Sequence, residues 1–198
     1  MAEKFLELAF TESVRKAQQH YYGRAQRIPP QSDRDPLTDE EIQFILARDS
    51  FYMATVTESG WPYVQHRGGR PGFLHVLSPT LIAFPDFKGN RQLLSTGNLI
   101  TNDRVAMFLM DYPQRTRLKI LGHARTVDAR DQPELITQLA EPEARGIVER
   151  LFFIEVVSFD WNCPKYITPR YTAAEVDKAV VPLRQRIAEL EAQLKAKN

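Results

Sequence analysis

The chain has 198 residues, of which 43% are hydrophobic and 26% charged, enough for one domain with a core and a terminal extension but too few for two full domains. Its 26 Lys and Arg residues nearly balance 25 Asp and Glu residues, and a net charge of +1 argues against a dedicated nucleic-acid-binding protein. The single cysteine, Cys163, excludes an internal disulfide and fits a reducing compartment. Neither a signal-peptide core nor an apolar run of about 20 residues is present, so we expect a globular cytoplasmic protein.

The first 37 residues predict a helical extension. Apolar residues recur at helical spacing over residues 4–26, and Thr11 to Ser13 form a candidate cap or break. The segment 27–36 contains three prolines and alternating charges, which is typical of an exposed connector. Thr38 followed by Glu41 is a capping-box pattern and predicts a helix over residues 38–48.

The middle of the chain predicts β-structure. Segments rich in β-branched, aromatic and alternating apolar residues predict strands at 51–57, 61–67, 73–77, 80–84, 104–112, 117–127 and 151–161. The segment 104–112 is apolar on both faces, as expected for a strand buried on both sides, and residues 132–149 are helical in character. Six or seven strands with short connections predict a mainly β fold, a largely antiparallel barrel with flanking helices.

The tail from 173 to 196 predicts an amphipathic helix. Its apolar residues step by three and four: Val180, Leu183, Ile187, Leu190 and Leu194. Such a narrow apolar seam either pairs with another surface or packs on the chain's own barrel, and the sequence leaves both alternatives open.

A small group of polar residues ends the apolar run near residue 84. Asp86, Lys88, Asn90 and Arg91 follow that run, with Gly89 among them. If a helix begins near Arg91 with Asn90 near its N-cap, its free amide groups and dipole favour a bound anion. The segment therefore predicts a phosphate-binding loop. Because its spacing is not that of a P-loop, nucleotide hydrolysis is disfavoured.

Two further segments carry cations. In HRGGRPG, residues 66–72, Arg67 and Arg70 can grip a phosphate and the adjacent glycines permit close backbone approach, although such a segment often forms only a turn. On the strand 117–127, Leu118, Ile120 and Ala124 face one way. The opposite face carries Arg117, Lys119, His123 and Arg125. We expect Arg117 and Lys119 to meet a bound anion and Arg125 to be solvated.

Aromatic residues follow the last strand. Trp161, Tyr166 and Tyr171 lie in a proline-rich segment with Lys165 and Arg170 between them, which favours a lid over a planar ligand, with simple packing of the tail as the alternative. The four histidines lack metal-site spacing, Cys163 lacks an evident His partner, and no GxSxG is present. The candidate site therefore predicts a bound cofactor rather than catalytic side chains.

The order of five blocks, VQHRGG, FPDFKGNRQLL, RVAMFLMDY, RTRLKILGHA and DWNCP…PRY, resembles the pyridoxamine 5'-phosphate oxidase-like flavin-binding proteins. The similarity covers roughly residues 38–171. It implies an FMN-binding split β-barrel over 38–171, between the extension 1–37 and a C-terminal helix in 172–198.

The resemblance also implies FMN as the cofactor, held at the interface of a homodimer. Matching the family's motifs gives these candidate cofactor-binding residues: Arg67, Gly68, Asp86, Lys88, Asn90, Arg91, Gln92, Arg117, Lys119, Trp161 and Arg170. Trp161 and Arg170 are expected to close the site from the partner subunit. Asn90-Arg91-Gln92 replaces the family's Ser-Arg-Lys, with Lys88 as the substitute cation.

The family's RLHDR-type substrate motif is absent from the tail. We therefore expect an FMN-dependent oxidoreductase of the related group, acting on a small molecule other than pyridoxamine phosphate. Two alternatives remain open: a non-catalytic carrier or sensor of flavin or haem, and a deazaflavin-dependent reductase. A nucleic-acid-binding barrel is disfavoured by the charge balance and by the lack of an aromatic strand face.

Overall fold

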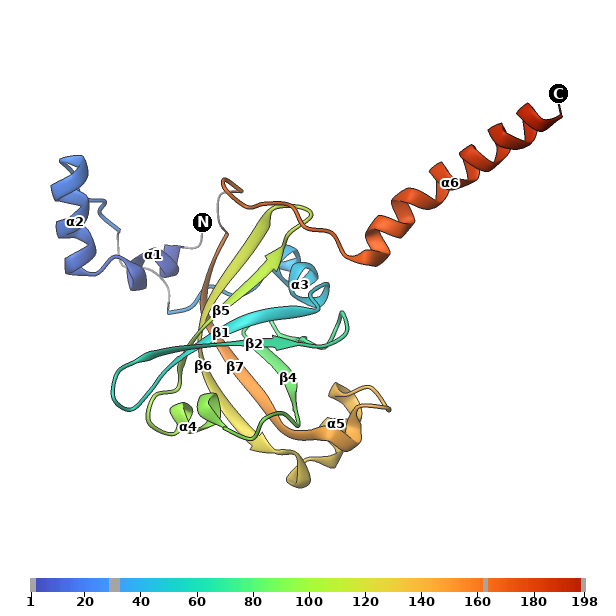
Figure 1. The fold of residues 1–198 in the computed structure, drawn as a ribbon. Helices are drawn as coiled ribbons and strands as arrows, with labels where there is room; N and C mark the ends of the chain where they lie inside the picture. Colours follow the sequence, from blue (N-terminus) through green and yellow to red (C-terminus); the bar gives the residue numbers. More distant parts are fainter. Residues whose placement is uncertain (1–2, 29–32, 162–163, 197–198) are drawn as a thin grey trace. The chain divides into compact units, whose positions relative to one another are not determined.

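The computed structural model describes residues 3–28, 33–161 and 164–196 (Figure 1). Contacts divide the chain into two compact units, one of residues 1–110 with 117–163 and one of 111–116 with 164–198. Each unit is described by itself below.

Seven strands form one sheet in the order β2-β1-β5-β6-β7-β4-β3. The strands are β1 (Ser50–Val56), β2 (Pro62–Gly68), β3 (His75–Ser78), β4 (Leu81–Phe87), β5 (Arg104–Asp111), β6 (Thr116–Asp128) and β7 (Val148–Trp161). The registered pairings of β1 with β2 and β5, of β4 with β3 and β7, and of β6 with β7 are antiparallel. The predicted mainly β, largely antiparallel fold is confirmed.

The sheet curls so that strands far apart in its order meet. The ring of Phe51 on β1 lies 5.1 Å from that of Phe84 on β4, and Arg67 on β2 pairs with Asp86 on β4. Side chains rather than a continuous backbone ladder join these strands, so the sheet is a split β-barrel (Figure 1).

Alternation of side chains along the strands builds the core. On β6, Leu118, Ile120 and Ala124 are buried as predicted. On β5, only the face carrying Val105, Met107 and Leu109 is fully buried. The expectation that this strand is buried on both sides was wrong, because its other face, with Ala106, Phe108 and Met110, lies on the outside of the barrel and is half-buried.

A β-bulge in β7 changes which side chains face the core. Leu121 pairs with Ser158 and Gly122 with Val156, which leaves Val157 as an extra residue. Before the bulge, Phe152, Ile154 and Val156 pack in the core. After it, the odd-numbered Phe159 and Trp161 do so. The Val157 carbonyl accepts from the backbone amide of Asp35, so the bulge also anchors the N-terminal connector (2.9 Å).

The helices of the described residues are α1 (Glu3–Ala9), α2 (Glu12–Tyr22), α3 (Asp39–Leu46), α4 (Leu94–Thr101), α5 (Pro133–Leu139) and α6 (Ala173–Lys195). Thr11 caps α2, and Thr38 with Glu41 forms the predicted capping box of α3. The predicted helix over 132–149 is shorter than expected: α5 ends at Leu139, and only a 3-10 turn (Arg145–Ile147) follows within that range.

The second unit contains α6, as the tail pattern predicted, and none of the helix residues is buried. Within the described ranges, no helix is both long and apolar enough to cross a membrane.

Candidate functional site

A polar cavity of about 200 Å³ lies where β4 ends and β7 begins. It is lined by Tyr63, Gln65, Arg67, Asp86, Phe87, Gly89, Asn90, Arg91, Gln92, Leu93, Leu94, Ser95, Thr96, Glu149 and Arg150. These residues come from β2, from the end of β4, from the loop 88–93, from the start of α4 and from the start of β7. The cavity therefore gathers five candidate cofactor-binding residues: Arg67, Asp86, Asn90, Arg91 and Gln92.

Asp86 organises the floor of this cavity. Its carboxylate is 5% exposed and forms ion pairs with Arg67 on one oxygen and with Arg150 Nε on the other, the latter at 2.9 Å. The Arg67 guanidinium lies 5.0 Å from the centre of the Phe152 ring. A buried carboxylate with two cationic partners costs less to desolvate than an isolated one, so Asp86 holds both arginines in place.

One hydrogen-bond donor on the floor of the cavity lacks an acceptor among the described residues. Arg67 Nε is buried and has no hydrogen-bond partner among the described residues. A buried polar atom without a partner costs free energy, and an anion in the cavity would relieve that cost. Three arginines (Arg67, Arg91 and Arg150) line the cavity against two carboxylates, Asp86 and Glu149, which leaves one net positive charge.

The loop before α4 departs from the sequence prediction. The helix begins at Leu94, not near Arg91, and Asn90 does not cap it. Instead, Asn90 Oδ1 accepts a hydrogen bond from the Gln92 amide at 3.1 Å, a local turn that competes with helix formation. Arg91 and Leu93 adopt left-handed backbone angles, with φ of 61° and 56°. Arg91 is exposed, and its side chain lines the cavity.

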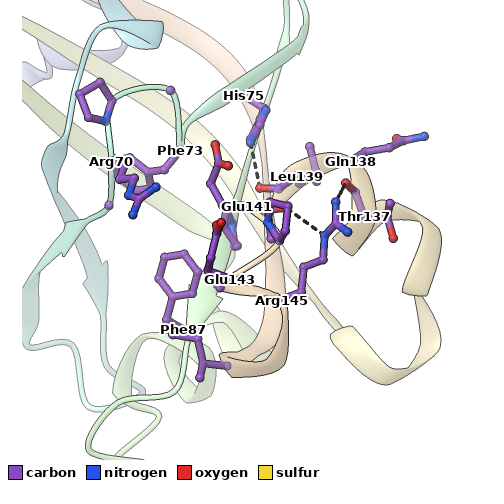
Figure 2. A pocket seen from close by; sticks show the side chains of 18 residues that line it. Arg70, Phe73, His75, Phe87, Thr137, Gln138, Leu139, Glu141, Glu143 and Arg145 are labelled. Carbon is purple, nitrogen blue, oxygen red and sulfur yellow. Dashed lines mark hydrogen bonds between the residues drawn. The ribbon is translucent and has the colours of Figure 1, made fainter.

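A second, larger cavity has a volume of about 500 Å³, and Figure 2 shows the residues that line it. It lies between the loop after β2, the strands β3 and β4, and the segment 137–147. Its apolar lining includes Phe73, Pro85, Phe87, Leu139 and Pro142. Phe87 lines both cavities, so a cationic compartment and an apolar compartment share one wall.

Internal hydrogen bonds fix the wall formed by residues 137–145, as Figure 2 shows. His75 Nε2 donates to the Leu139 carbonyl oxygen at 2.9 Å. Arg145 donates from Nε to the Ala140 carbonyl oxygen at 3.2 Å and from a terminal nitrogen to that of Thr137 at 2.9 Å. These hydrogen bonds satisfy carbonyl oxygens at the end of α5, so Arg145 acts here as a structural residue.

Three other charged side chains line the apolar cavity: Arg70, Glu141 and Glu143. All three are exposed. The buried polar and charged residues of the described chain are Glu41, Thr55, Asp86, Ser95, Ser158 and Asp160. None of these lines the apolar cavity.

Other predicted cofactor residues lie far from the polar cavity within one chain. On the β6–β7 pair, Leu118 is opposite Trp161, whereas Asp128 is opposite Arg150. About 3.3 Å of rise per residue therefore places up to about 30 Å of strand between Lys119 and the cavity end of β6. Arg117, Lys119 and Trp161 therefore do not line the polar cavity with Arg67.

Each of these distant residues has interactions of its own. Lys119 Nζ lies 2.8 Å from Asp160 Oδ2 and 4.7 Å from the Phe5 ring centre. Asp160 Oδ1 is buried without a hydrogen-bond partner among the described residues. The Arg117 guanidinium lies 5.5 Å from the centre of the Phe108 ring, on the outer face of the barrel.

Trp161 is held by α3. Its Nε1 donates to Glu41 Oε1 at 2.5 Å, and its ring packs edge-on against Phe44 with 4.8 Å between centres. Burial raises the pKa of Glu41, but hydrogen bonds from Thr38 and Trp161 outweigh that effect, so the pKa lies below its ordinary value.

The remaining candidates lie elsewhere. Gly68 pairs with Ser50 on β1 and lines neither cavity, whereas its neighbour Gly69 lines the apolar one. Lys88 belongs to the loop 88–93, and its backbone amide donates a hydrogen bond to the Ile147 carbonyl oxygen (2.7 Å). Arg170 belongs to the second unit, where its guanidinium lies 4.9 Å from the Tyr112 ring centre.

The interpretation of Cys163 concerns a position outside the described residues. No cluster of three metal-binding side chains is found in the described ranges.

Sequence reasoning missed Arg150. It sits at the start of β7, 64 residues from its partner Asp86, and contacts it because β4 and β7 pair in register at those two residues. A cation preceding the apolar run LFFI was the only signal in the sequence, and it did not specify a partner.

One family model and several solved structures are similar to this chain. The family model for pyridoxamine 5'-phosphate oxidase matches residues 37–151. HupZ from Group A Streptococcus is 9% identical over 68% of this chain and 100% of its own, with a TM-score of 0.49. An F420 reductase is 20% identical over 62% of this chain and 98% of its own, with a TM-score of 0.43. An FMN-binding protein from Syntrophomonas wolfei is 9% identical over 63% of this chain and 85% of its own, with a TM-score of 0.44. No curated protein matches the chain.

Proposed function

The chain belongs to the pyridoxamine 5'-phosphate oxidase family, and we propose that it is a cytoplasmic FMN-dependent oxidoreductase within it. The observation that carries this proposal is the pair of adjoining cavities that share Phe87. One is small and cationic, and the other is larger and apolar. A ligand with an anionic head and a planar apolar body matches both, and FMN has this form.

The polar cavity supplies the groups that a phosphate requires. Arg91 and Arg150 offer charged donors, and the orphan Nε of Arg67 offers a further one. Asn90 and Gln92 add amide groups on the same loop. Phe87 and Phe73 would contact the ring system and exclude water from it. When bound, FMN supplies the electron-transfer chemistry, while the protein provides position and electrostatics.

A homodimer with the flavin at its interface is part of this proposal. Trp161, Lys119 and Arg117 do not line the polar cavity of their own chain, and in this proposal a second copy supplies them. The outer face of β1, β2 and β5 supports such an interface, because Tyr52 and Val64 there are 40% and 60% exposed beside the half-buried Phe108. An apolar face of this kind usually needs a cover.

The test is spectroscopic. Purified full-length protein should be yellow or should take up one FMN per chain in a titration, whereas riboflavin, which lacks the phosphate, should bind much more weakly. Dilution to monomer should release the flavin, and added FMN should favour the dimer. A colourless protein that binds neither FMN nor deazaflavin would exclude the proposal, and a monomer that retains FMN would exclude the interface site.

A non-catalytic carrier or sensor is the second candidate. The observation in its favour is that none of the buried polar or charged residues lines the apolar cavity. Mixing the flavin-loaded protein with NADH, NADPH or amine donors under anaerobic conditions separates the two. Bleaching of the flavin absorbance on a turnover timescale supports the oxidoreductase, and an unchanged spectrum with tight binding supports the carrier. Pyridoxamine phosphate is expected to fail as a donor.

A further inference from the structure

Helix α6 presents a row of large apolar side chains to solvent. Leu183, Ile187, Leu190 and Leu194 are 63%, 56%, 42% and 65% exposed, and no residue of the helix is buried. A capping box between Thr172 and Glu175 favours the start of the helix. Most of the stability of a helix in a protein comes from packing of its apolar face, so this row calls for a partner.

The row has the spacing of a coiled-coil seam. From Val176 onward six large apolar residues alternate in steps of four and three, which assigns heptad positions a and d. The a positions are Val180, Ile187 and Leu194, and the d positions are Val176, Leu183 and Leu190, while Val181 lies beside this row at position b. An amphipathic helix lying on a globular surface usually has a broader apolar stripe than this row.

The residue types at these positions specify a geometry. Two of the three a positions are β-branched, Val180 and Ile187, and two of the three d positions are leucine. This combination favours parallel two-stranded coiled coils over higher oligomers. The seam therefore fits a second copy of the same helix in parallel orientation.

The flanking charges agree with this orientation. In the same heptad frame Arg186 occupies position g and Glu191 the following position e. In a parallel pair these two positions meet across the interface, so each Arg186 would face Glu191 of the other copy. Within one helix the two residues are five apart and are not neighbours, and Arg186 instead contacts Glu189 at 2.9 Å.

The proline inside the helix leaves the seam intact. Pro182 occupies position c, on the side away from a and d. It removes one backbone hydrogen bond and bends the helix locally. Three of the six seam residues precede or adjoin it, and three follow it without interruption.

From the seam, its residue types and its charge pattern, we propose that α6 is a dimerisation element that pairs in parallel with α6 of a second copy of this chain. The pairing adds a second contact to the proposed barrel dimer and does not involve flavin. Where the barrels already associate, tethering raises the local concentration of the helices and makes a short coiled coil sufficient.

Disulfide trapping tests this pairing in the full-length chain. On a Cys163→Ser background, Leu190→Cys places a thiol at a d position, and Gln185→Cys places one at the outward-facing position f of the preceding heptad. Under mild oxidation we expect most of the Leu190→Cys chains to become linked in pairs, and the Gln185→Cys chains to remain single. Equal linkage of both variants, or none with Leu190→Cys, would overturn the proposal. Linkage only in a mixture of Leu190→Cys and Val180→Cys chains would show antiparallel pairing and would likewise overturn it.

Charge exchange provides an independent measurement. In the Leu190→Cys chain, Arg186→Glu should lower the yield of linked chains, because it places like charges opposite Glu191. Adding Glu191→Arg should restore that yield, although it cannot restore the contact with Glu189 within the helix. If the double exchange stays as low as Arg186→Glu alone, the residues do not meet. Both readouts are independent of cofactor, so a failure here is distinguishable from a failure of FMN binding.

Discussion

Arg67 on β2 and Asp86 on β4 form an ion pair between the first and the next-to-last strand of the sheet order. The contact closes the barrel and lies on the floor of the polar cavity at the same time. Stability of the fold and the proposed binding of FMN would therefore depend on the same side chains.

Because of this double role, we expect Asp86→Asn to lower the free energy of unfolding strongly. Loss of the carboxylate would leave Arg67 and Arg150 facing each other without their shared partner, and breaking a buried pair costs about 3–5 kcal/mol. Urea unfolding monitored by circular dichroism would measure the free energy of unfolding. The matched control is Asp128→Asn, since Asp128 pairs with Arg130 on the surface and should contribute far less. Equal losses in both variants would contradict a closing role for Asp86.

Arg91→Ala should weaken FMN binding by about 1.5–3 kcal/mol, the usual contribution of a hydrogen bond to a charged group. Arg91 is exposed, so its removal tests the cavity without loss of packing. Arg125→Ala is the control, because that guanidinium lies 4.4 Å from the centre of the Phe153 ring and outside both cavities. Fluorescence titration with FMN gives both affinities. If Arg125→Ala weakens FMN as much, the phosphate does not bind in the polar cavity.

The hydrogen bond between Trp161 and Glu41 predicts a loss of stability in acid. Because the folded-state pKa of Glu41 lies below its ordinary value of 4.5, its contribution is fully present above that value and is lost as the pH falls through the lower folded pKa. The free energy of unfolding should fall as the pH drops below 4.5, accompanied by a change in Trp161 emission in a Trp61→Phe background. Glu41→Gln should flatten this dependence. An unchanged slope would assign the acid sensitivity to other carboxylates.

Substitution of alanine for Gly122 and for Gly97 should change the free energy of unfolding in opposite directions. A Cβ at Gly122 would lie 2.5 Å from the backbone oxygen of Glu155, so Gly122→Ala forces the paired strands apart and should cost about 1–3 kcal/mol. A Cβ at Gly97, inside α4, would meet nothing within 4 Å, so Gly97→Ala should stabilise by about 0.5–1 kcal/mol through helix propensity. Thermal unfolding compares the two variants directly. Stabilisation by Gly122→Ala would contradict the close approach of β6 and β7.

Local patterns were sufficient to predict most elements of the fold. The alternation in β6 and the capping box at Thr38 depend on residues close together in sequence. The ion pair of Arg150 with Asp86 could not be predicted, because it depends on strand register across 64 residues. The start of α4 was misplaced because the side chain of Asn90 binds the next turn of backbone. The apolar cavity was also missed, since α5 and the segment after it form its wall only through tertiary hydrogen bonds.

The extra residue at Val157 has a consequence for how this chain tolerates insertions and deletions. Val157 has no partner on β6, so removing that one position would leave Ser158 to Trp161 opposite the same residues of β6 and on the same faces. Asp160 would stay opposite Lys119, and Trp161 would keep Glu41 and Phe44 as neighbours, whereas the carbonyl group that accepts from the Asp35 amide would be lost. A chain that lacks the extra residue and retains the same contacts must therefore carry its tryptophan one position closer to Val156. Gap placement in an alignment of relatives should follow this rule.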